Sequence, residues 1–385
     1  MIEIKDKRNC CGCHACVQKC PKHCIKMIAD KEGFLYPRVN KSVCIDCGIC
    51  ESVCPQIHIS STKMPLGCFA IKHPSRDIQL ASSSGGAFSI LAEYVLKQNG
   101  VVFGAAFNKE WGVEHKYIEH IEDLESLRMS KYVQSKIGIS YQYVQSFLKD
   151  GRWVLFVGTP CQVHGLKLFL KKDYENLLTV DFVCHGVPSK AIWQKYLKSI
   201  SVQNAFISKI QFRNKQYGWE KFSLVLHTNH VVSVDEKAKS GVETSTKILS
   251  ETRHKNPYLR GFIHDLYLRP SCYACKNKGF SSNSDLTVAD FWGIKNTYPQ
   301  LYDDAGVSCV TINSLNGSKF LEMAKIQGID VDFKQVLKFN PSFIYSVKKP
   351  PFRNYFFKLI NLIPFKPLVI MGQGYNKIAR ILKLY

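Results

Sequence analysis

Short apolar runs alternate with helical apolar periodicity from residue 64 to about residue 340. Residues 67–72 (GCFAIK) predict a strand, and the stretch ASSSGGAFSILAEYVLKQNG predicts a helix with its N-cap at Ser84 and its stop at Gly100. The apolar face of this helix comprises Phe88, Leu91, Ala92, Val95 and Leu96. A further strand, VVFGAAF, follows directly. Such alternation is typical of an α/β domain.

A βαβ unit is predicted further along the chain. WVLFVG predicts a strand, residues 163–171 a helix, and LLTVDFV a second strand. Strands joined in this way run parallel, and open α/β sheets build their sites at the carboxyl ends of the strands. Cys161 and Cys184 follow these two strands, so we expect both at the same edge of the sheet.

The first 60 residues contain an internal repeat of a different kind. The pattern C-x2-C-x2-C-x3-C-P occurs twice, as Cys10, Cys13, Cys16 and Cys20 before Pro21, and as Cys44, Cys47, Cys50 and Cys54 before Pro55. Bacterial two-cluster ferredoxins use this spacing, and in them the cysteine before proline ligates the other cluster. We therefore expect one 4Fe-4S cluster on Cys10, Cys13, Cys16 and Cys54, and a second on Cys44, Cys47, Cys50 and Cys20. Zinc is the alternative, but the last two cysteines of each motif would then be surplus.

The residues between the two motifs also carry a prediction. The segment DKEGFLYPRVN predicts a hairpin whose Phe34, Tyr36 and Val39 are available to cover the clusters. Cys11 and Cys24 fall outside the repeat, and we expect them to be spectators.

Composition bounds the class of protein. The 385 residues are 45% hydrophobic and 22% charged, which predicts a globular chain of two or three domains. The start, MIEIKDKRNCC, lacks the apolar region of a signal peptide, and no run of about 18 apolar residues predicts a membrane span. We therefore expect the cytoplasm, where clustered cysteines, such as many of the 16 here, bind metals more often than they form disulfides.

The chain is strongly basic. Its formal charge of +21 would fall to roughly +15 with three clusters bound. The positive electrostatic field of such a chain favours an acidic redox protein, a polyanionic cofactor or a membrane surface as partner. No nucleic-acid-binding motif is present, and no G-x-G-x-x-G follows a strand, which disfavours nucleic acid and a Rossmann nicotinamide site.

Several residues of the body predict chemistry. The turn before the first helix can bring backbone N–H groups to a phosphate, although a serine-rich capping turn explains it equally well. Cys272 and Cys275 form a C-x2-C unit, and with Cys161 and Cys184 they make one more set of four thiols. A redox disulfide between Cys272 and Cys275 is the alternative. A Cys184–His185 nucleophile and base is disfavoured, because adjacent residues of an extended segment point to opposite sides.

The order of motifs resembles one family. These motifs are the two ferredoxin repeats, SSSGG (82–86), SKYVQS (130–135), GTPCQVHGLK (158–167), VCHGVPS (183–189), RPSCYACK (269–276) and SDLTVADFWG (284–293). They resemble the family of coenzyme F420 hydrogenase/dehydrogenase beta subunits. The resemblance implies FAD in the α/β body and a third 4Fe-4S cluster on Cys161, Cys184, Cys272 and Cys275. It also implies flavin contacts from Ser83, Ser84, Gly85, Gly86, Lys131, Tyr132, Gln134 and Ser135.

The fold class expected is thus an α+β ferredoxin-like N-terminal domain followed by an α/β flavin-binding domain. The predicted boundaries are 1–60 for the ferredoxin domain, 64–340 for the body, divided into 64–145 and 146–340, and 341–385 for a basic, apolar C-terminal extension. That extension either docks a partner or membrane face, or packs on the body with a solvated basic side.

The expected function is that of a flavin and iron-sulfur oxidoreductase. It would pass electrons between an F420-like hydride carrier or an organic substrate and ferredoxin-type clusters, and ferredoxin is a candidate partner. The alternative is a non-catalytic electron-transfer subunit of a larger complex. Because the cofactors carry the redox chemistry, His185 is the one side chain proposed as catalytic.

Overall fold

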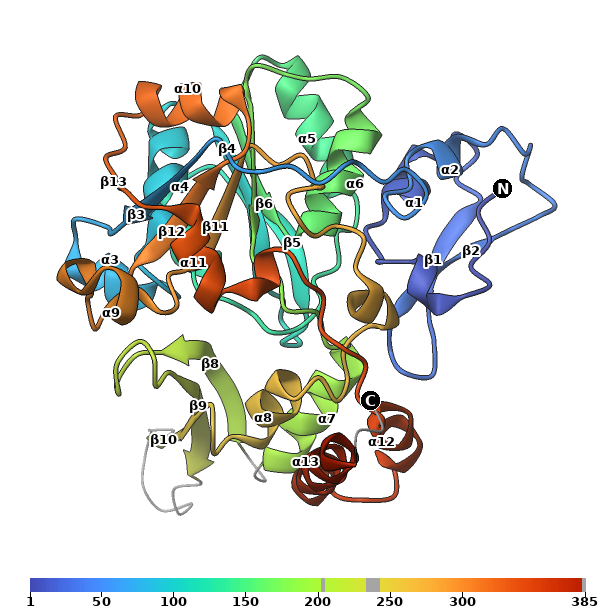
Figure 1. Ribbon diagram of the computed structural model, residues 1–385. Helices are drawn as coiled ribbons and strands as arrows, with labels where there is room; N and C mark the ends of the chain where they lie inside the picture. The colour runs from blue at the N-terminus through green and yellow to red at the C-terminus, as the bar shows by residue number, and fades with distance from the viewer. Residues whose placement is uncertain (202–204, 233–242, 383–385) are drawn as a thin grey trace.

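The computed structural model describes residues 1–201, 205–232 and 243–382 (Figure 1). Three parts are visible in Figure 1: an N-terminal segment (residues 1–60), a sheet body, and a second lobe below the body. The second lobe contains a separate three-stranded sheet, whereas the body is built on an eight-stranded sheet. Among the described residues, no helix is long and apolar enough to cross a membrane.

The N-terminal segment folds around a short antiparallel hairpin. Its elements are η1 (Lys7–Asn9), α1 (Ala15–Lys19), β1 (Ile25–Ala29), β2 (Leu35–Val39) and α2 (Ile49–Ser52). The predicted hairpin at residues 30–40 supplies the turn and the second strand, while the first strand precedes it and pairs Ile25 with Val39. Phe34 and Tyr36 are buried beside Cys10, so the hairpin covers one cysteine motif.

The large sheet is mixed, in the order β13-β3-β12-β11-β7-β6-β4-β5. Its strands are β3 (Gly67–Ile71), β4 (Val101–Phe107), β5 (Val113–Ile118), β6 (Val154–Gly158), β7 (Leu177–Phe182), β11 (Leu286–Asp290), β12 (Ser308–Ile312) and β13 (Ile329–Asp330). The four central strands β11, β7, β6 and β4 are parallel, and the outer strands are antiparallel. The predicted α/β class and the parallel βαβ unit are therefore confirmed.

Helices cover both faces of this sheet. They are α3 (Arg76–Ala81), α4 (Ala87–Lys97), α5 (Ser140–Lys149), α6 (Pro160–Leu170), α9 (Ile294–Thr297), α10 (Leu315–Met323) and α11 (Phe333–Phe339), with short turns η2 (Ile121–Ser126), η3 (Pro270–Ala274), η4 (Pro299–Leu301) and η5 (Pro341–Phe343). Strand β4 shows why both faces are buried: Val101 and Phe103 pack toward α5 and α6, whereas Val102 packs toward α4. Alternate side chains of a strand point to opposite faces, so an almost wholly apolar strand needs two layers of helices.

Two predicted helix boundaries are wrong. The first helix begins at Ala87 with Gly86 as its N-cap at φ +91°, because the Ser84 hydroxyl donates to the carbonyl of Val307 instead of capping the helix. The second helix begins at Pro160 rather than at residue 163, because Thr159 and Gln162 form a capping box there.

The second lobe has an aromatic core of its own. Its elements are α7 (Lys190–Ile200), β8 (Ala205–Asn214), β9 (Ser223–Val232), β10 (Glu243–Thr252), α8 (Pro257–Ile263), α12 (Arg353–Leu359) and α13 (Phe365–Ile381). Trp193 and Tyr258 lie at its centre, with ring centroids 4.8 Å apart. Phe356 and Phe365 of the C-terminal helices belong to the same core, so α12 and α13 are packed into this lobe.

Candidate functional site

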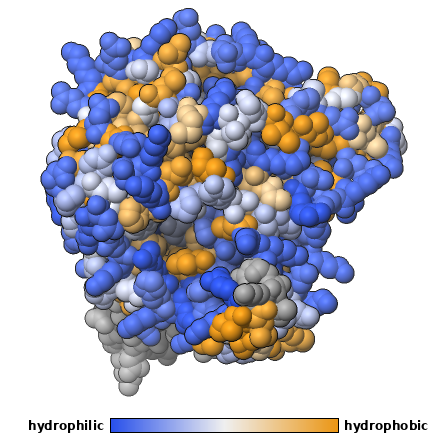
Figure 2. Space-filling model, in the orientation of Figure 1, coloured by the Kyte–Doolittle hydropathy of each residue, from blue (hydrophilic) through white to orange (hydrophobic). Residues whose placement is uncertain are grey.

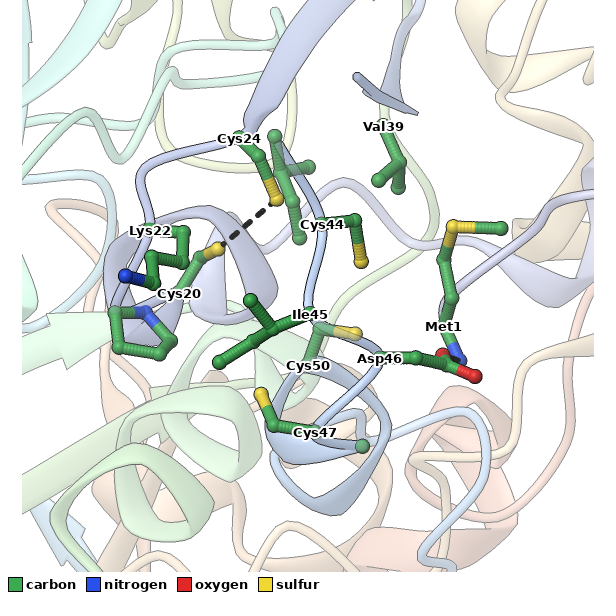
Figure 3. A pocket seen from close by; sticks show the side chains of 13 residues that line it. Met1, Cys20, Lys22, Cys24, Val39, Cys44, Ile45, Asp46, Cys47 and Cys50 are labelled. Atoms are coloured by element: carbon green, nitrogen blue, oxygen red, sulfur yellow. Dashed lines mark hydrogen bonds and ion pairs between the residues drawn. The ribbon is translucent and has the colours of Figure 1, made fainter. Parts of the chain in front are cut away.

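Two cavities in the N-terminal segment are lined by cysteines. The first is drawn in Figure 3 and is lined by Cys20, Cys24, Cys44, Cys47 and Cys50. It contains about 340 Å³ of space between atoms, part of it open to solvent. Cys20 belongs to the first motif, and the structure brings it to three cysteines of the second.

The second cavity has the reciprocal lining. It contains about 320 Å³ of space and is lined by Cys10, Cys11, Cys13, Cys16 and Cys54, with Ile2, Ile4 and Met27 among its apolar neighbours. Cys54 belongs to the second motif. Each cavity therefore has three cysteines from one motif and the cysteine before proline from the other, which is the arrangement that the spacing predicts. Among the described residues, no group of three or more His, Cys, Asp or Glu side chains is arranged to hold a single metal ion.

The backbone of the two motifs follows one pattern. Gly12 and Asp46 precede the second cysteine of each motif at φ +72° and φ +48°, and His14 and Gly48 follow it at φ +63° and φ +72°. Left-handed residues on both sides of a cysteine curl the loop, and α1 and α2 then begin at once. This curl directs the three thiols of each motif into one cavity.

The cysteines of the body form a third group. Cys161 begins α6 directly after β6, Cys184 follows β7, and Cys272 and Cys275 belong to and follow η3. Burial, together with the neighbouring Cys161 and Cys275 thiols, raises the pKa of Cys184 to about 12. The same neighbours act on Cys272, so the four thiols lie within electrostatic reach of one another. The structure thus brings together the four cysteines that the sequence left without a local partner set.

Cys11 and Cys24 are closer to these groups than expected. The Cys13 and Cys161 thiols are both close enough to act on the pKa of Cys11, which is raised, so Cys11 lies between the second cavity and the third group. Cys24 Sγ is 3.4 Å from Cys20 Sγ at the first cavity. Both residues stand outside the repeat in sequence but line its cavities in space.

Arg269 fastens the N-terminal segment to the body. Its guanidinium is fully buried, and it donates to the carbonyls of Cys10 at 2.8 Å and Leu35 at 2.9 Å and to Gln134 Oε1 at 3.0 Å. It also lies over the Tyr36 ring, 4.4 Å from the centroid. Gln134 in turn donates to the Cys11 carbonyl at 3.0 Å. The side chain of Gln134, expected at a flavin, is therefore engaged at this interface.

The other expected flavin residues form two loops that meet. Ser83 Oγ accepts from the Ser130 amide at 2.7 Å and lies 2.9 Å from the Ser130 hydroxyl. Gly85 packs so closely that an added Cβ would lie 2.3 Å from the Ile71 carbonyl oxygen. Ser135 is buried and accepts from Gln162 at 3.0 Å. The loops are adjacent as expected, but several of their polar atoms have partners within the protein.

Lys131 and Tyr132 lie where these loops approach the second lobe. Lys131 Nζ donates to the carbonyls of Arg128 at 2.9 Å and Met129 at 3.2 Å, and burial lowers the pKa of Lys131 to about 7. The Tyr132 ring stacks on Phe262 at 4.7 Å. The Lys131 side chain is thus held by backbone carbonyls at the boundary between the body and the second lobe.

A basic and aromatic cluster next to Tyr132 was not predicted. Arg213 is buried, donates to both carboxylate oxygens of Asp290 at 2.7 and 2.9 Å, and donates to the Tyr132 hydroxyl at 3.3 Å. The Trp219 and Trp292 rings stack 5.0 Å apart at 1°, and the guanidiniums of Arg213 and Arg253 both lie 5.6 Å from Trp292. Of the side-chain atoms described, Arg213 Nε is buried without a hydrogen-bond partner.

Lys215 joins this cluster to the serine-glycine loop. Its ammonium donates to the carbonyls of Ser84 at 2.6 Å and Gln79 at 2.7 Å, and burial lowers its pKa to about 7. Two residues of the cluster, Asp290 and Trp292, belong to the motif SDLTVADFWG. Arg213 and Lys215 could have been found from the alternation of polar and apolar residues in 205–214, which predicts a strand that carries Arg213 and leads to Lys215.

His185, the predicted catalytic residue, is half-buried beside this region. Its Nε2 lies 2.7 Å from Asp265 Oδ1, and its ring meets Phe262 edge-on at 5.1 Å. Phe262 also stacks on Tyr132, so one aromatic ring separates His185 from the expected flavin loop.

The fold and these sites define a cysteine-rich α/β protein. Residues 151–334 match the family model that describes the C terminus of the beta subunit in coenzyme F420 hydrogenase/dehydrogenase. The resemblance drawn from the motifs is thereby confirmed.

Two individual relatives each share less than a quarter of their aligned residues with this chain. The chain is 22% identical over 279 residues to coenzyme F420-dependent sulfite reductase of Methanocaldococcus jannaschii, covering 71% of this chain and 40% of that protein. It is 24% identical over 191 residues to the F subunit of F(420)H(2) dehydrogenase of Methanosarcina mazei, covering 47% of this chain and 54% of the relative. The chain thus spans about half the length of these relatives.

Two further similarities are shorter or weaker. A ferredoxin of Mycolicibacterium smegmatis is 37% identical over 54 residues, covering 14% of this chain and 40% of the ferredoxin. A solved structure of the F420-reducing [NiFe] hydrogenase complex from Methanosarcina barkeri aligns with a TM-score of 0.44 and 16% identity, over 70% of this chain and 82% of that one.

The crossed cysteine sets generate a first prediction. In the double variant Cys20→Ala/Cys24→Ala, purified without oxygen, the first cavity should lose its metal, because it loses its one ligand from the first motif. Cys24 is removed as well because its thiol could replace the missing one. Alkylation followed by mass spectrometry should find Cys44, Cys47 and Cys50 newly labelled. The single variant Cys24→Ala is the control and should resemble wild type. Labelling of Cys10, Cys13 and Cys16 instead would show that the sets do not cross.

Arg269 generates a second prediction. Arg269→Met leaves three buried oxygens without their donor, and each unsatisfied group costs about 1–3 kcal/mol. Hydrogen exchange should therefore rise by several orders of magnitude across residues 1–60 and far less in the large sheet. Arg8→Met, which removes an exposed ion pair with Asp6, is the matched control and should cost less than about 1 kcal/mol. Equal protection in both variants would mean that Arg269 does not hold the segment.

Proposed function

We propose that this chain is an FAD-dependent iron-sulfur oxidoreductase that exchanges electrons with an F420-like hydride carrier or an organic substrate. One observation carries the proposal: three groups of cysteines succeed one another from the exposed Cys47 to the carboxyl edge of the parallel sheet, with Cys11 between the second and the third. The family match and the names of the relatives support F420-linked redox chemistry.

The donor sets fit 4Fe-4S clusters. Each cavity of the N-terminal segment has four thiols in ferredoxin spacing and an apolar lining, and the body supplies four more buried or half-buried thiols. Bound clusters supply one-electron transfer. The chain's own contribution is to hold and shield them, and the Ile2 amide, which donates to Cys50 Sγ at 3.3 Å, is one hydrogen bond that would stabilise a thiolate ligand.

The basic and aromatic cluster supports the flavin part of the proposal. Lys131, Lys215 and Arg213 are basic side chains gathered around the two expected flavin loops, and the buried Nε of Arg213 lacks a partner among the described atoms. A pyrophosphate would supply the missing negative charge, and the planes of Tyr132 and Trp292 suit a ring system. A bound flavin would link two-electron to one-electron transfer.

His185 is proposed as the catalytic side chain beside this site. Its Nε2 lies 2.7 Å from Asp265 Oδ1, a contact that orients the imidazole. The neighbouring Phe262 excludes water from one side of the ring.

A second candidate function is that of an electron-transfer component that needs a catalytic partner. The name of the Methanosarcina mazei relative, a subunit of a dehydrogenase, favours it. Turnover of the isolated chain with reduced F420 and an artificial electron acceptor separates the two functions, because only the first predicts activity without a partner.

The proposed cofactors are tested by composition. Protein purified without oxygen should contain about twelve irons, about twelve sulfides and about one FAD per chain, and its visible absorption should bleach with dithionite. About eight irons in a fully loaded sample would remove the third cluster. Zinc alone after anaerobic reconstitution with iron and sulfide would overturn the proposal.

The third group of cysteines generates a further prediction. Cys161→Ala should lower the iron content by about four, because a cubane needs four thiolates, and FAD should be retained. Electron transfer from chemically reduced flavin to the N-terminal clusters, followed by stopped-flow absorbance, should become at least tenfold slower. Cys309→Ala, a buried cysteine of β12 outside the proposed ligand sets, is the control. Unchanged transfer after a measured loss of four irons would show that the third cluster lies off the path.

A further inference from the structure

Helix α13 is anchored to the protein by one face. Phe365, Leu368, Val369 and Ala379 are buried, and the first three belong to the core of the second lobe, where α13 packs against α8 and α7. Gly372 lets the helix pack closely on the rest of the second lobe, since an added Cβ would lie 2.8 Å from the Phe352 ring. The helix therefore cannot leave the lobe without opening its core.

The opposite face of α13 is apolar as well. The exposed residues on it are Ile370, Met371, Tyr375, Ile378 and Ile381, followed by Leu382 just after the helix. Their spacing places them on one stripe of a helix with 3.6 residues per turn. Ile381 is 70% exposed, and Leu362 in the turn before the helix is 77% exposed. Figure 2 shows the resulting apolar patch at the bottom of the molecule, where Figure 1 shows α13.

Basic residues border this stripe. Lys366 and Lys377 are exposed, and with Arg380 they follow a row along one side of α13. Residues 333–385 contain ten lysines and arginines and no aspartate or glutamate. The outward side is thus neither a solvated basic face nor an ordinary polar one: an exposed apolar stripe lies next to charge of a single sign.

We propose that α13 and the turn before it bind the surface of an anionic membrane. In such an arrangement the helix lies parallel to the surface, its apolar stripe enters the headgroup boundary, and its lysines meet lipid phosphates. The anchored face keeps α13 on the protein, so only the outward stripe reaches the lipid. In Figure 1 the N-terminal segment lies on a different side from α13, and its exposed Cys47 stays accessible to a redox partner.

A membrane explains the pattern better than a protein partner. The cores of protein interfaces are apolar, but their rims carry polar residues, including charges of both signs. Here the charged residues of α13 and of the segment before it, from residue 333 on, are all basic, which matches a surface of uniform negative charge. A second copy of this chain would bring the same positive rim against itself, and the like charges would repel.

The test uses the full-length protein and vesicles. The protein should cosediment with vesicles of phosphatidylcholine and phosphatidylglycerol, far less with phosphatidylcholine alone, and less as salt is raised. Lys366→Gln/Lys377→Gln should weaken binding by about 25-fold, which is roughly fivefold for each charge. Ile378→Ser/Ile381→Ser should weaken it by roughly tenfold or more, because both side chains lose apolar contact with lipid.

The matched control is Ile139→Ser/Lys149→Gln. Ile139 is 52% exposed and Lys149 is exposed, and they lie at the two ends of α5, which Figure 1 shows at the opposite end of the molecule. This variant should bind vesicles like wild type, and unchanged thermal unfolding should show that all three variants are folded. The proposal is overturned if the wild-type protein ignores anionic vesicles at low salt, or if Ile378→Ser/Ile381→Ser binds them unchanged. It is also overturned if sedimentation finds dimers that this variant abolishes while vesicles are not bound, because the stripe would then join two copies of the chain.

Discussion

The burial of the Arg269 guanidinium is the constraint on which the arrangement of the sites depends. A guanidinium cannot lose protons at neutral pH, so removal from water requires acceptors around its donors. Two of these are carbonyls of the N-terminal segment, at Cys10 and Leu35, and one is the side chain of Gln134 in the body. Arg269 stands three residues before Cys272, so the same short segment that supplies the third cysteine group also holds the first motif against it.

This fastening explains how cysteines distant in sequence become neighbours. Gly165 of α6 packs so tightly that an added Cβ would lie 3.0 Å from Cys13 Sγ, and the Cys11 thiol lies near Cys161, four residues earlier in the same helix. The second cavity of the N-terminal segment and the cysteines at the sheet edge therefore share one helix as a wall. The distance between these two groups of cysteines is therefore set by close side-chain packing.

The sequence was informative where local chemistry decides the structure. The parallel strands before Cys161 and Cys184 were predicted correctly, because apolar runs are local signals, and the linings of the two cavities agree with the crossed sets that the thiol spacing predicts. The helix start at Ser84 was not, since its hydroxyl meets the Val307 carbonyl, more than two hundred residues away. Gln134 is a similar case, because the acceptor of its amide is the carbonyl of Cys11. No local pattern shows a partner that only the tertiary fold provides.

The basic and aromatic cluster could not be predicted from the sequence, because its residues come together only when the second lobe contacts the body. Arg213 comes from β8 of the second lobe, whereas Asp290 ends β11 of the large sheet, so their buried ion pair exists only when lobe and body are in contact. Breaking such a pair leaves an uncompensated buried charge, which costs about 3–5 kcal/mol. The pair thus keeps the lobe closed over Tyr132 and Trp292, and an anion bound beside Arg213 would share the same guanidinium. If the proposed flavin binds at this boundary, its retention and the closure of the two lobes are coupled, and a substitution that loosens the lobe would also weaken flavin binding.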